Sequence, residues 1–216
     1  MRASSIWAMP KPSAWRAMPG CQPGPICASW TRGAIMALPA RLQAGQRLLR
    51  PIVEHDRAAV VAVLSQFEVS RWLTSVPHPY ANADFDAWLP GLPPGGIWAI
   101  EAAGRFVGVV GLNVDGLGYW IDPAAQGQGH ATAAASCLLA AHFAAADAAP
   151  VIARRFADNA ASAHVLGKLG FRETGRGVKF ARSLGRDVPQ VWLELTRGDW
   201  DAKRLEIPAR PGQDKA

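Results

Sequence analysis

The segment from Tyr119 to Thr132 constrains the fold of this chain more than any other stretch of its sequence. It reads YWIDPAAQGQGHAT, so an apolar strand runs into a loop with two glycines and a small-residue helical run follows directly. Gly127 and Gly129 let backbone N–H groups come close to a ligand. The unpaired donors and the positive dipole end of the next helix attract anionic oxygen atoms. The segment therefore predicts a phosphate or pyrophosphate cradle where a strand meets a helix.

Hydrophobic patterns on both sides of this segment predict a mixed α/β sheet. Apolar runs indicate strands, which we expect at 47–53, 97–102, 106–114, 117–121 and 151–156, around Val178, and at 188–195. Helical spacing indicates helices, which we expect at 60–67, 82–89, 127–146 and 159–169. The dipeptide Asp115-Gly116 predicts a hairpin turn between two of the strands. Antiparallel strands come first and helix crossovers follow, which differs from the repeated βαβ order of a doubly wound dinucleotide-binding fold.

Two motifs in this frame resemble those of the GNAT superfamily of N-acetyltransferases. Gln126, Gly129 and Ala131 meet its acetyl-CoA signature, Q/R-x-x-G-x-G/A, and the wider run GYWIDPAAQGQGHATAAA resembles its RimJ/RimL-like branch. The run DNAASAHVLGKLGF at 158–171 resembles the second signature of that branch. RLLRP and VWLELTRGDW resemble its first and last strands, so the resemblance covers roughly residues 46–200.

The resemblance implies a mostly antiparallel central sheet with helices on both faces and two strands that splay apart at the cofactor site. Acetyl-CoA would lie in this V between 117–121 and 151–156, with the backbone N–H near Ile121 polarising the thioester carbonyl. Asn159 and Ser162 would cap the following helix and contact the pantetheine arm or the thioester. The residues implied to bind the cofactor are Trp120, Ile121, Gln126, Gly127, Gln128, Gly129, His130, Ala131, Thr132, Asn159 and Ser162.

Four positions depart from the pattern of the superfamily, one of them Ala133, which stands where many members have glutamate. His130 replaces the usual tyrosine, and we expect it to be exposed to solvent, with contact to a phosphate as the alternative. The glutamate that often deprotonates the amine aligns with Gly116, which leaves Asp115 as the candidate general base. The competing explanation for Asp115 is turn geometry alone. Leu166 replaces the tyrosine that often protonates the departing thiolate, so solvent or the cofactor supplies that proton.

The reaction implied is direct transfer of the acetyl group to a primary amine while both substrates are bound. Ile121 and Ser162 join Asp115 as the residues implied to take part in catalysis. The acceptor is either a protein N-terminal α-amine or a small amine, and it is expected against aromatic and polar side chains: Trp72, His78, Tyr80, Trp88 and Tyr119. Because the usual glutamate and tyrosine are missing, a non-catalytic acyl-CoA-binding module is the alternative.

The formal charge of +6 is concentrated at the N-terminus. Residues 1–35 carry four basic residues and no acidic one, so only about +2 remains for the rest of the chain, which argues against a nucleic-acid partner. The same segment has five prolines, three tryptophans and no periodic pattern. We expect it to be a disordered or non-native extension, with a transit peptide as a looser alternative. At the other end we expect residues 201–216 to form a tail.

The remaining composition is that of one ordinary soluble domain, since half of the residues are hydrophobic and 19% are charged. Three cysteines, at 21, 27 and 137, match neither a disulfide framework nor zinc-ligand spacing, so we expect a reducing cytoplasm and no metal. No apolar run reaches the length of a membrane span. A monomer and a homodimer both remain open.

Overall fold

The computed structural model describes residues 38–93 and 95–206 of the chain. The predicted extension at 1–35 lies outside the described residues, as does most of the predicted tail at 201–216. Residues 201–206 of that tail continue a helix, α6 (Arg197–Glu206), that begins within the expected domain. No helix in the described ranges is long and apolar enough to cross a membrane.

One eight-stranded sheet forms the centre of the molecule, in the order β1-β2-β3-β4-β5-β6-β8-β7. All neighbouring pairs among the described strands are antiparallel except β5 and β6, which are parallel. The mixed, mostly antiparallel sheet expected from the sequence is confirmed. The strands are β1 (Leu42–Ala44), β2 (Arg47–Pro51), β3 (Ile97–Ala102), β4 (Arg105–Asn113), β5 (Gly116–Ile121), β6 (Val151–Phe156), β7 (Arg172–Ala181) and β8 (Arg186–Leu195).

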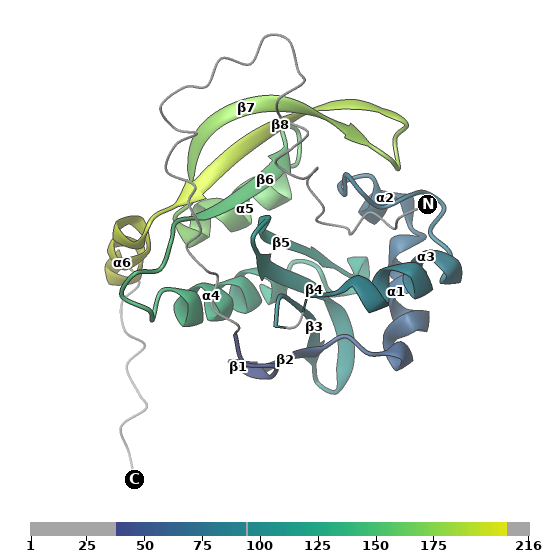
Figure 1. Cartoon of the computed structure of the whole chain (residues 1–216), viewed down its shortest axis with the longest axis horizontal. Helices are drawn as coiled ribbons and strands as arrows, with labels where there is room; N and C mark the ends of the chain where they lie inside the picture. The colour runs from purple at the N-terminus through teal and green to yellow at the C-terminus, as the bar shows by residue number, and fades with distance from the viewer. Residues whose placement is uncertain (1–37, 94, 207–216) are drawn as a thin grey trace.

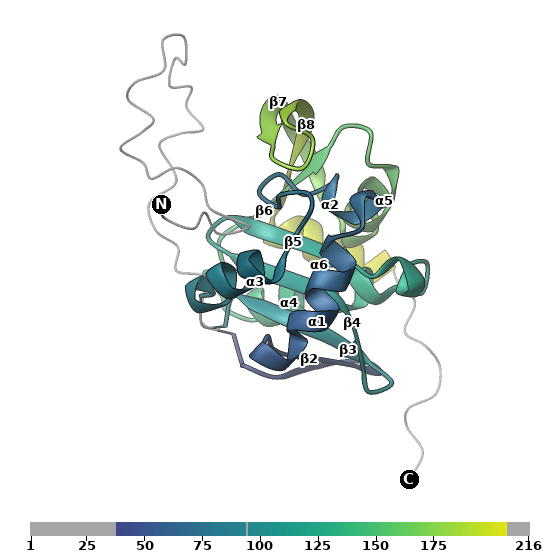
Figure 2. The same cartoon turned by 90° about the vertical axis from the view of Figure 1, so that its right-hand side faces the viewer.

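Helices cover both faces of this sheet, as expected (Figures 1 and 2). The first three lie over one face, and α4 and α5 lie over the other. The α-helices are α1 (Arg57–Leu64), α2 (Phe67–Ser70), α3 (Asn82–Trp88), α4 (His130–His142), α5 (Ala160–Leu169) and α6. Short 3-10 turns lie at η3 (Glu54–Asp56), η4 (Leu89–Gly91) and η5 (Pro123–Ala125).

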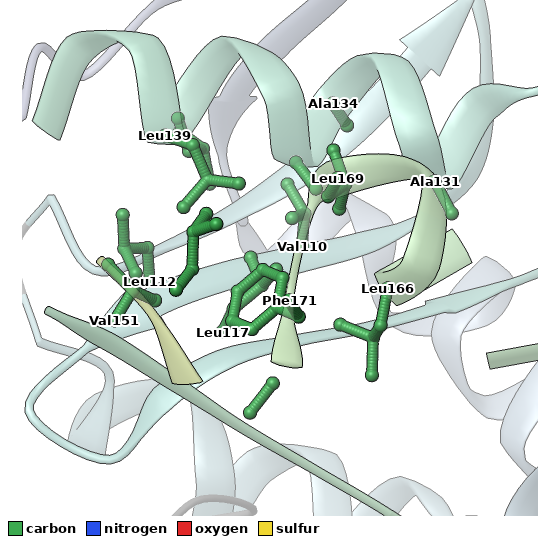
Figure 3. Close-up of a cluster of buried hydrophobic side chains, with 14 of the residues drawn as sticks. Val110, Leu112, Leu117, Ala131, Ala134, Leu139, Val151, Leu166, Leu169 and Phe171 are labelled. Atoms are coloured by element: carbon green, nitrogen blue, oxygen red, sulfur yellow. The ribbon is translucent and has the colours of Figure 1, made fainter. Parts of the chain in front are cut away.

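Strand alternation divides the core into two main clusters, one on each side of the sheet. Val110 and Ile121 point into the cluster shared with α4 and α5, which Figure 3 shows with Leu139 of α4 and Leu166 of α5. Their neighbours Val109 and Trp120 point into the cluster beneath α1 and α3. The two sides of β5 are therefore distinct, and odd-numbered residues of its second half face α4 and α5.

The turn between β4 and β5 differs from the expected one. Asn113 pairs with Gly116, so Val114 and Asp115 form the turn and Gly116 is the first residue of β5. Gly116 has a φ of +104°, and a Cβ added there would lie 2.2 Å from the carbonyl oxygen of Ile152. The glycine serves the close approach of β6 to β5 rather than the turn itself.

Helix α4 is shorter than the predicted 127–146. Gly127 and Gly129 adopt left-handed φ values of 75° and 74°, so the helix begins only at His130, and Phe143 ends it. The prediction missed β1 and α2, which are three and four residues long and too short to show a period. It also missed α6, where Trp200 is buried but no apolar stripe repeats.

Candidate functional site

Strands β5 and β6 lie side by side at one end and diverge toward the other. Among the described residues they pair at a single position, Leu117 with Ala153. Beyond it, β5 continues to Ile121 and the glycine loop, while β6 continues to Phe156 and the start of α5. Figure 1 shows the two strands separating in this direction. The sequence expectation that these strands splay into a V is confirmed.

The backbone of β5 alternates between its paired edge and the V. The N–H of Asp122 donates to the carbonyl of Val107, and Trp120 pairs with Val109 in the same ladder. In an antiparallel ladder the residues between such bonded positions point away from the partner strand. The N–H of Ile121 therefore points from β4 into the V, where a thioester carbonyl could accept its hydrogen bond.

The indole of Trp120 points to the other side of the sheet. It lies in the core beneath α1 and α3, 4% exposed, with its ring 5.8 Å from that of Phe106. The structure therefore does not bring this side chain to the V with the loop.

The glycine loop is held in shape by short local contacts. The Asp122 carboxylate accepts a hydrogen bond from the N–H of Ala124 at 3.0 Å, and the Gln126 amide donates to the carbonyl of Ile121 at 3.0 Å. A Cβ added to Gly127 or Gly129 would meet no atom within 4 Å. Open space thus lies next to both glycines, beside the first amides of α4, which have no partners within the helix. This combination fits an anionic diphosphate group.

His130 was expected to be exposed, but its side chain is buried beneath Arg47 of β2. Its residue exposure is 8%, and the Arg47 Nε donates to its Nδ1 at 2.7 Å. A second Arg47 nitrogen donates to the carbonyl oxygen of Gln128 at 2.9 Å. Burial, and then the charge of Arg47, lower the pKa of His130. Sequence reasoning missed Arg47 as a site residue because it lies 83 positions earlier in the chain.

A hydroxyl pair connects β5 to α5, the helix that follows β6. The Ser162 Oγ lies 3.0 Å from the Tyr119 hydroxyl, and the Ser162 N–H donates to the Asn159 side-chain oxygen at 2.9 Å. Asn159 thereby caps α5, as the sequence predicted. Burial raises the pKa of Tyr119 to about 12, so both hydroxyls stay protonated at neutral pH.

The residues predicted to contact the acceptor do not form one group. Tyr119 faces α5, whereas Tyr80 and Trp88 are buried in the core beneath α1 and α3. Trp72 is half-buried and packs edge-on against Phe156 at the end of β6, next to the V. His78 is exposed, with its Nδ1 3.2 Å from the Ser70 hydroxyl oxygen.

Two further residues near this group were not anticipated. Phe156 joins Trp72 as an aromatic wall, and the Arg71 guanidinium lies 4.7 Å from the centre of the Trp72 ring. Neither belongs to a recognisable motif, so only their position in the fold reveals them. The acceptor roles of all these residues stay predictions.

The predicted base, Asp115, lies in the turn at the closed end of the V. Its carbonyl oxygen accepts a hydrogen bond from Arg154 of β6 at 3.4 Å, and its N–H donates to the Asn113 side chain at 2.8 Å. The rise of a strand separates Asp115 from Ile121 by roughly 20 Å. Its role as a base stays a prediction.

The described residues contain no group of three or more histidine, cysteine, aspartate or glutamate side chains that could hold a metal ion.

The comparisons with known proteins find similarity to acetyltransferases. The family model described as an acetyltransferase (GNAT) domain matches residues 46–172. RimJ of Mycobacterium smegmatis, solved in complex with CoA-disulfide, is 26% identical with a TM-score of 0.57, and the match covers 78% of this chain and 87% of that one. None of the curated proteins gives a significant match.

Two more distant structures support the fold alone. A GNAT-family acetyltransferase from Bacillus anthracis is 18% identical with a TM-score of 0.64, covering 73% of this chain and 99% of that one. The ribosomal-protein-S5-alanine acetyltransferase from Vibrio fischeri is 17% identical with a TM-score of 0.61, covering 75% of this chain and 99% of that one.

Proposed function

This chain belongs to the GNAT family of acetyltransferases, and from that membership we propose that it transfers an acetyl group from acetyl-CoA to a primary amine within a ternary complex. The observation that carries the proposal is the V between β5 and β6, which ends at a loop with open space beside Gly127 and Gly129. Acetyl-CoA supplies the activated thioester. The residues of the chain bind it, orient it and transfer protons during the reaction.

The loop and the first turn of α4 are the proposed site for the pyrophosphate. Backbone amides of Gly127 to Thr132 would donate to its oxygen atoms, and the dipole of α4 favours their negative charge. The pantetheine arm would then lie along β5, with the N–H of Ile121 toward the thioester carbonyl. A donor aimed at a developing oxyanion contributes about 3 kcal/mol to the transition state.

The hydroxyl pair is the proposed proton source for the departing thiolate. The hydroxyl oxygens of Ser162 and Tyr119 lie 3.0 Å apart, and the Ser162 N–H donates to the side chain of Asn159, which caps α5. Tyr119 can donate to Ser162 while Ser162 donates to the sulfur, so one proton moves toward the leaving group. The proton that the attacking amine releases on forming the amide, carried by solvent, then restores the Tyr119 hydroxyl. This pair would replace the tyrosine whose position Leu166 occupies.

The acceptor amine would approach from the face of α1 to α3, past Trp72 and Phe156. We propose that the chain belongs to the RimJ/RimL-like branch, and its two motifs and the 26% identity to RimJ support this. The resemblance to this branch suggests a protein N-terminal α-amine as the acceptor, and a small amine is the other candidate. We also propose that the enzyme works in the cytoplasm.

The test is release of free thiol from acetyl-CoA with a panel of peptides and small amines. We expect thiol release that depends on the amine, with an acetylated amine detected by mass spectrometry in equal amount. Binding of CoA without amine-dependent thiol release would instead identify a non-catalytic acyl-CoA-binding module. Peptides that differ only by a blocked N-terminus provide the matched control for α-amine acceptors.

A further inference from the structure

One arginine connects the sheet to the cofactor loop through two hydrogen bonds. Arg47, the first residue of β2, donates to the His130 Nδ1 at 2.7 Å and to the Gln128 carbonyl at 2.9 Å. The His130 Nε2 lies 3.3 Å from the Gln128 side-chain oxygen. The backbone of the loop and the first residue of α4 are therefore held against β2 by one guanidinium.

This arrangement requires a neutral imidazole at His130. The Arg47 guanidinium is always protonated and can only donate, so the His130 Nδ1 must accept and its Nε2 carries the hydrogen toward Gln128. A proton on Nδ1 would remove the acceptor and place two cations in direct contact. Burial and the Arg47 charge lower the pKa of His130, in agreement with the neutral form.

We propose that Arg47 is a positioning residue for acetyl-CoA, which holds the loop 126–129 through neutral His130 and the Gln128 carbonyl in the shape that presents its amides to the pyrophosphate. The inference rests on the proposed function. The loop is exposed and contains two glycines in left-handed conformations, so its backbone has much freedom to lose on binding. Fixing the loop in advance lowers that cost and raises affinity.

Protonation of His130 breaks its hydrogen bond with Arg47, so the affinity for CoA falls as the pH is lowered. A cavity of about 480 Å³, lined by Arg47 and His130, gives solvent access to the ring. The other charged groups that line it are Arg105 of β4 and Asp122, whose carboxylate is bonded to the N–H of Ala124. If His130 contacted a phosphate directly, its protonation would strengthen CoA binding. The sign of the pH dependence separates the two roles.

The first experiment is calorimetric titration of CoA into the full chain between pH 5 and pH 8. At pH 8, Arg47→Met and His130→Leu should bind CoA at least about tenfold more weakly than the wild type, because a charged hydrogen bond is lost. His130→Asn places an oxygen close to the Nδ1 position and should bind nearly as well as the wild type. Asn does not titrate, so the CoA affinity of His130→Asn divided by that of the wild type should rise as the pH falls. Titration of the CoA phosphates changes both affinities alike and therefore cancels in this ratio.

The second experiment is amide hydrogen exchange of residues 126–132 without CoA. Exchange should be faster in Arg47→Met and His130→Leu than in the wild type, and restored in His130→Asn. Equal CoA affinity and equal exchange in wild type and Arg47→Met would overturn the positioning role while leaving the proposed function intact. A wild-type affinity that rises toward acid relative to His130→Asn would also overturn it. A wild-type protein that binds no CoA would instead overturn the proposed function.

Discussion

At the scale of single residues, the hydroxyl pair in the V is the proposed replacement for a missing motif residue. Leu166 replaces the usual tyrosine and has no hydroxyl. Its side chain is 1% exposed and is part of the core. Ser162, one turn earlier on the same helix, faces Tyr119 across the V instead. Both hydroxyls are available as donors because burial keeps the pKa of Tyr119 well above neutral pH.

Ser162→Ala tests this pair without disturbing the helix, because Asn159 caps α5 through the backbone N–H of residue 162. We expect kcat to fall about 100-fold, near the lower end for removal of a general acid, since a thiolate leaves readily. The KM for acetyl-CoA should change much less. Steady-state thiol release measures both, and an unchanged kcat would return proton supply to solvent or to the cofactor.

Asp115→Asn tests the predicted base at the closed end of the V. Asn keeps most of the turn propensity of Asp, so stability should hardly change. Because Asp115 lies in the turn, far along β5 from Ile121, we expect kcat/KM to stay within a few-fold of the wild type from pH 6 to pH 9. A loss of ~100-fold at neutral pH that shrinks as the pH rises would instead establish Asp115 as the base.

At the scale of elements, the glycine loop determines where α4 begins. The left-handed conformations of Gly127 and Gly129 delay the helix until His130. Space next to these glycines is open in the structure. A side chain at this point would fill the space proposed for phosphate oxygens.

Gly129→Val should therefore weaken CoA binding by at least about tenfold, since it both strains a left-handed residue and fills the cradle. Gly185→Val is the matched control, because Gly185 also has a left-handed φ, of 62°, and open space around it, but lies in the β7–β8 turn. Both variants should lose about 1–2 kcal/mol of unfolding free energy. Titration of CoA distinguishes them, and equal affinities would place the cradle elsewhere.

An ion pair joins β2 to the turn before α1. Arg50 donates two hydrogen bonds of 2.8 Å to the Asp56 carboxylate, which also accepts the N–H of Val53 at 2.9 Å. Burial by itself raises the pKa of Asp56, but these hydrogen bonds outweigh it and the net pKa is lowered. The stabilisation is therefore present above the pKa of the unfolded carboxyl, about 3.9, and is lost as the pH falls through the lower folded value.

Asp56→Asn should lower the free energy of unfolding at pH 7 by about 2–3 kcal/mol, because Arg50 loses its most buried partner but keeps Glu101. The difference from the wild type should shrink as the pH falls below about 4. Urea unfolding at pH 7 and pH 3 measures both values. Glu101→Gln, at a more exposed position, is the control and should cost less.

At the scale of the whole molecule, the V divides the sheet into two parts that acetyl-CoA would connect. Strands β1 to β5 form one part and β6 to β8 the other, with one pair of residues in register between them. Helices α4 and α5 contact each other and join the parts on one face. A ligand that fills the V should therefore stabilise the complete fold rather than a single loop.

Acetyl-CoA should raise the free energy of unfolding by ~2.7 kcal/mol at one hundred times its dissociation constant. A thermal shift series with acetyl-CoA, CoA, ATP and NAD measures the effect. We expect acetyl-CoA and CoA to raise the melting temperature in step with their concentration. Stabilisation by NAD or ATP without any by CoA would contradict the proposed cofactor.

The sequence by itself determined the parts of this protein that depend on local pattern. Strand and helix periods predicted the mixed sheet, and the glycines at 127 and 129 predicted the loop between β5 and α4, because these features are encoded within a few neighbouring residues. Asn159 was recognised as a cap for the same reason.

The tertiary structure alone decided which distant residues meet and which face each side chain takes. His130 was expected at the surface, yet Arg47 covers it from another strand, because α4 packs across the sheet and contacts β2 as well as β5. Trp120 and Tyr119 are adjacent in sequence, but strand alternation sends one under α1 and α3 and the other toward Ser162. Long-range packing sets such contacts, and no local pattern in the sequence carries that information.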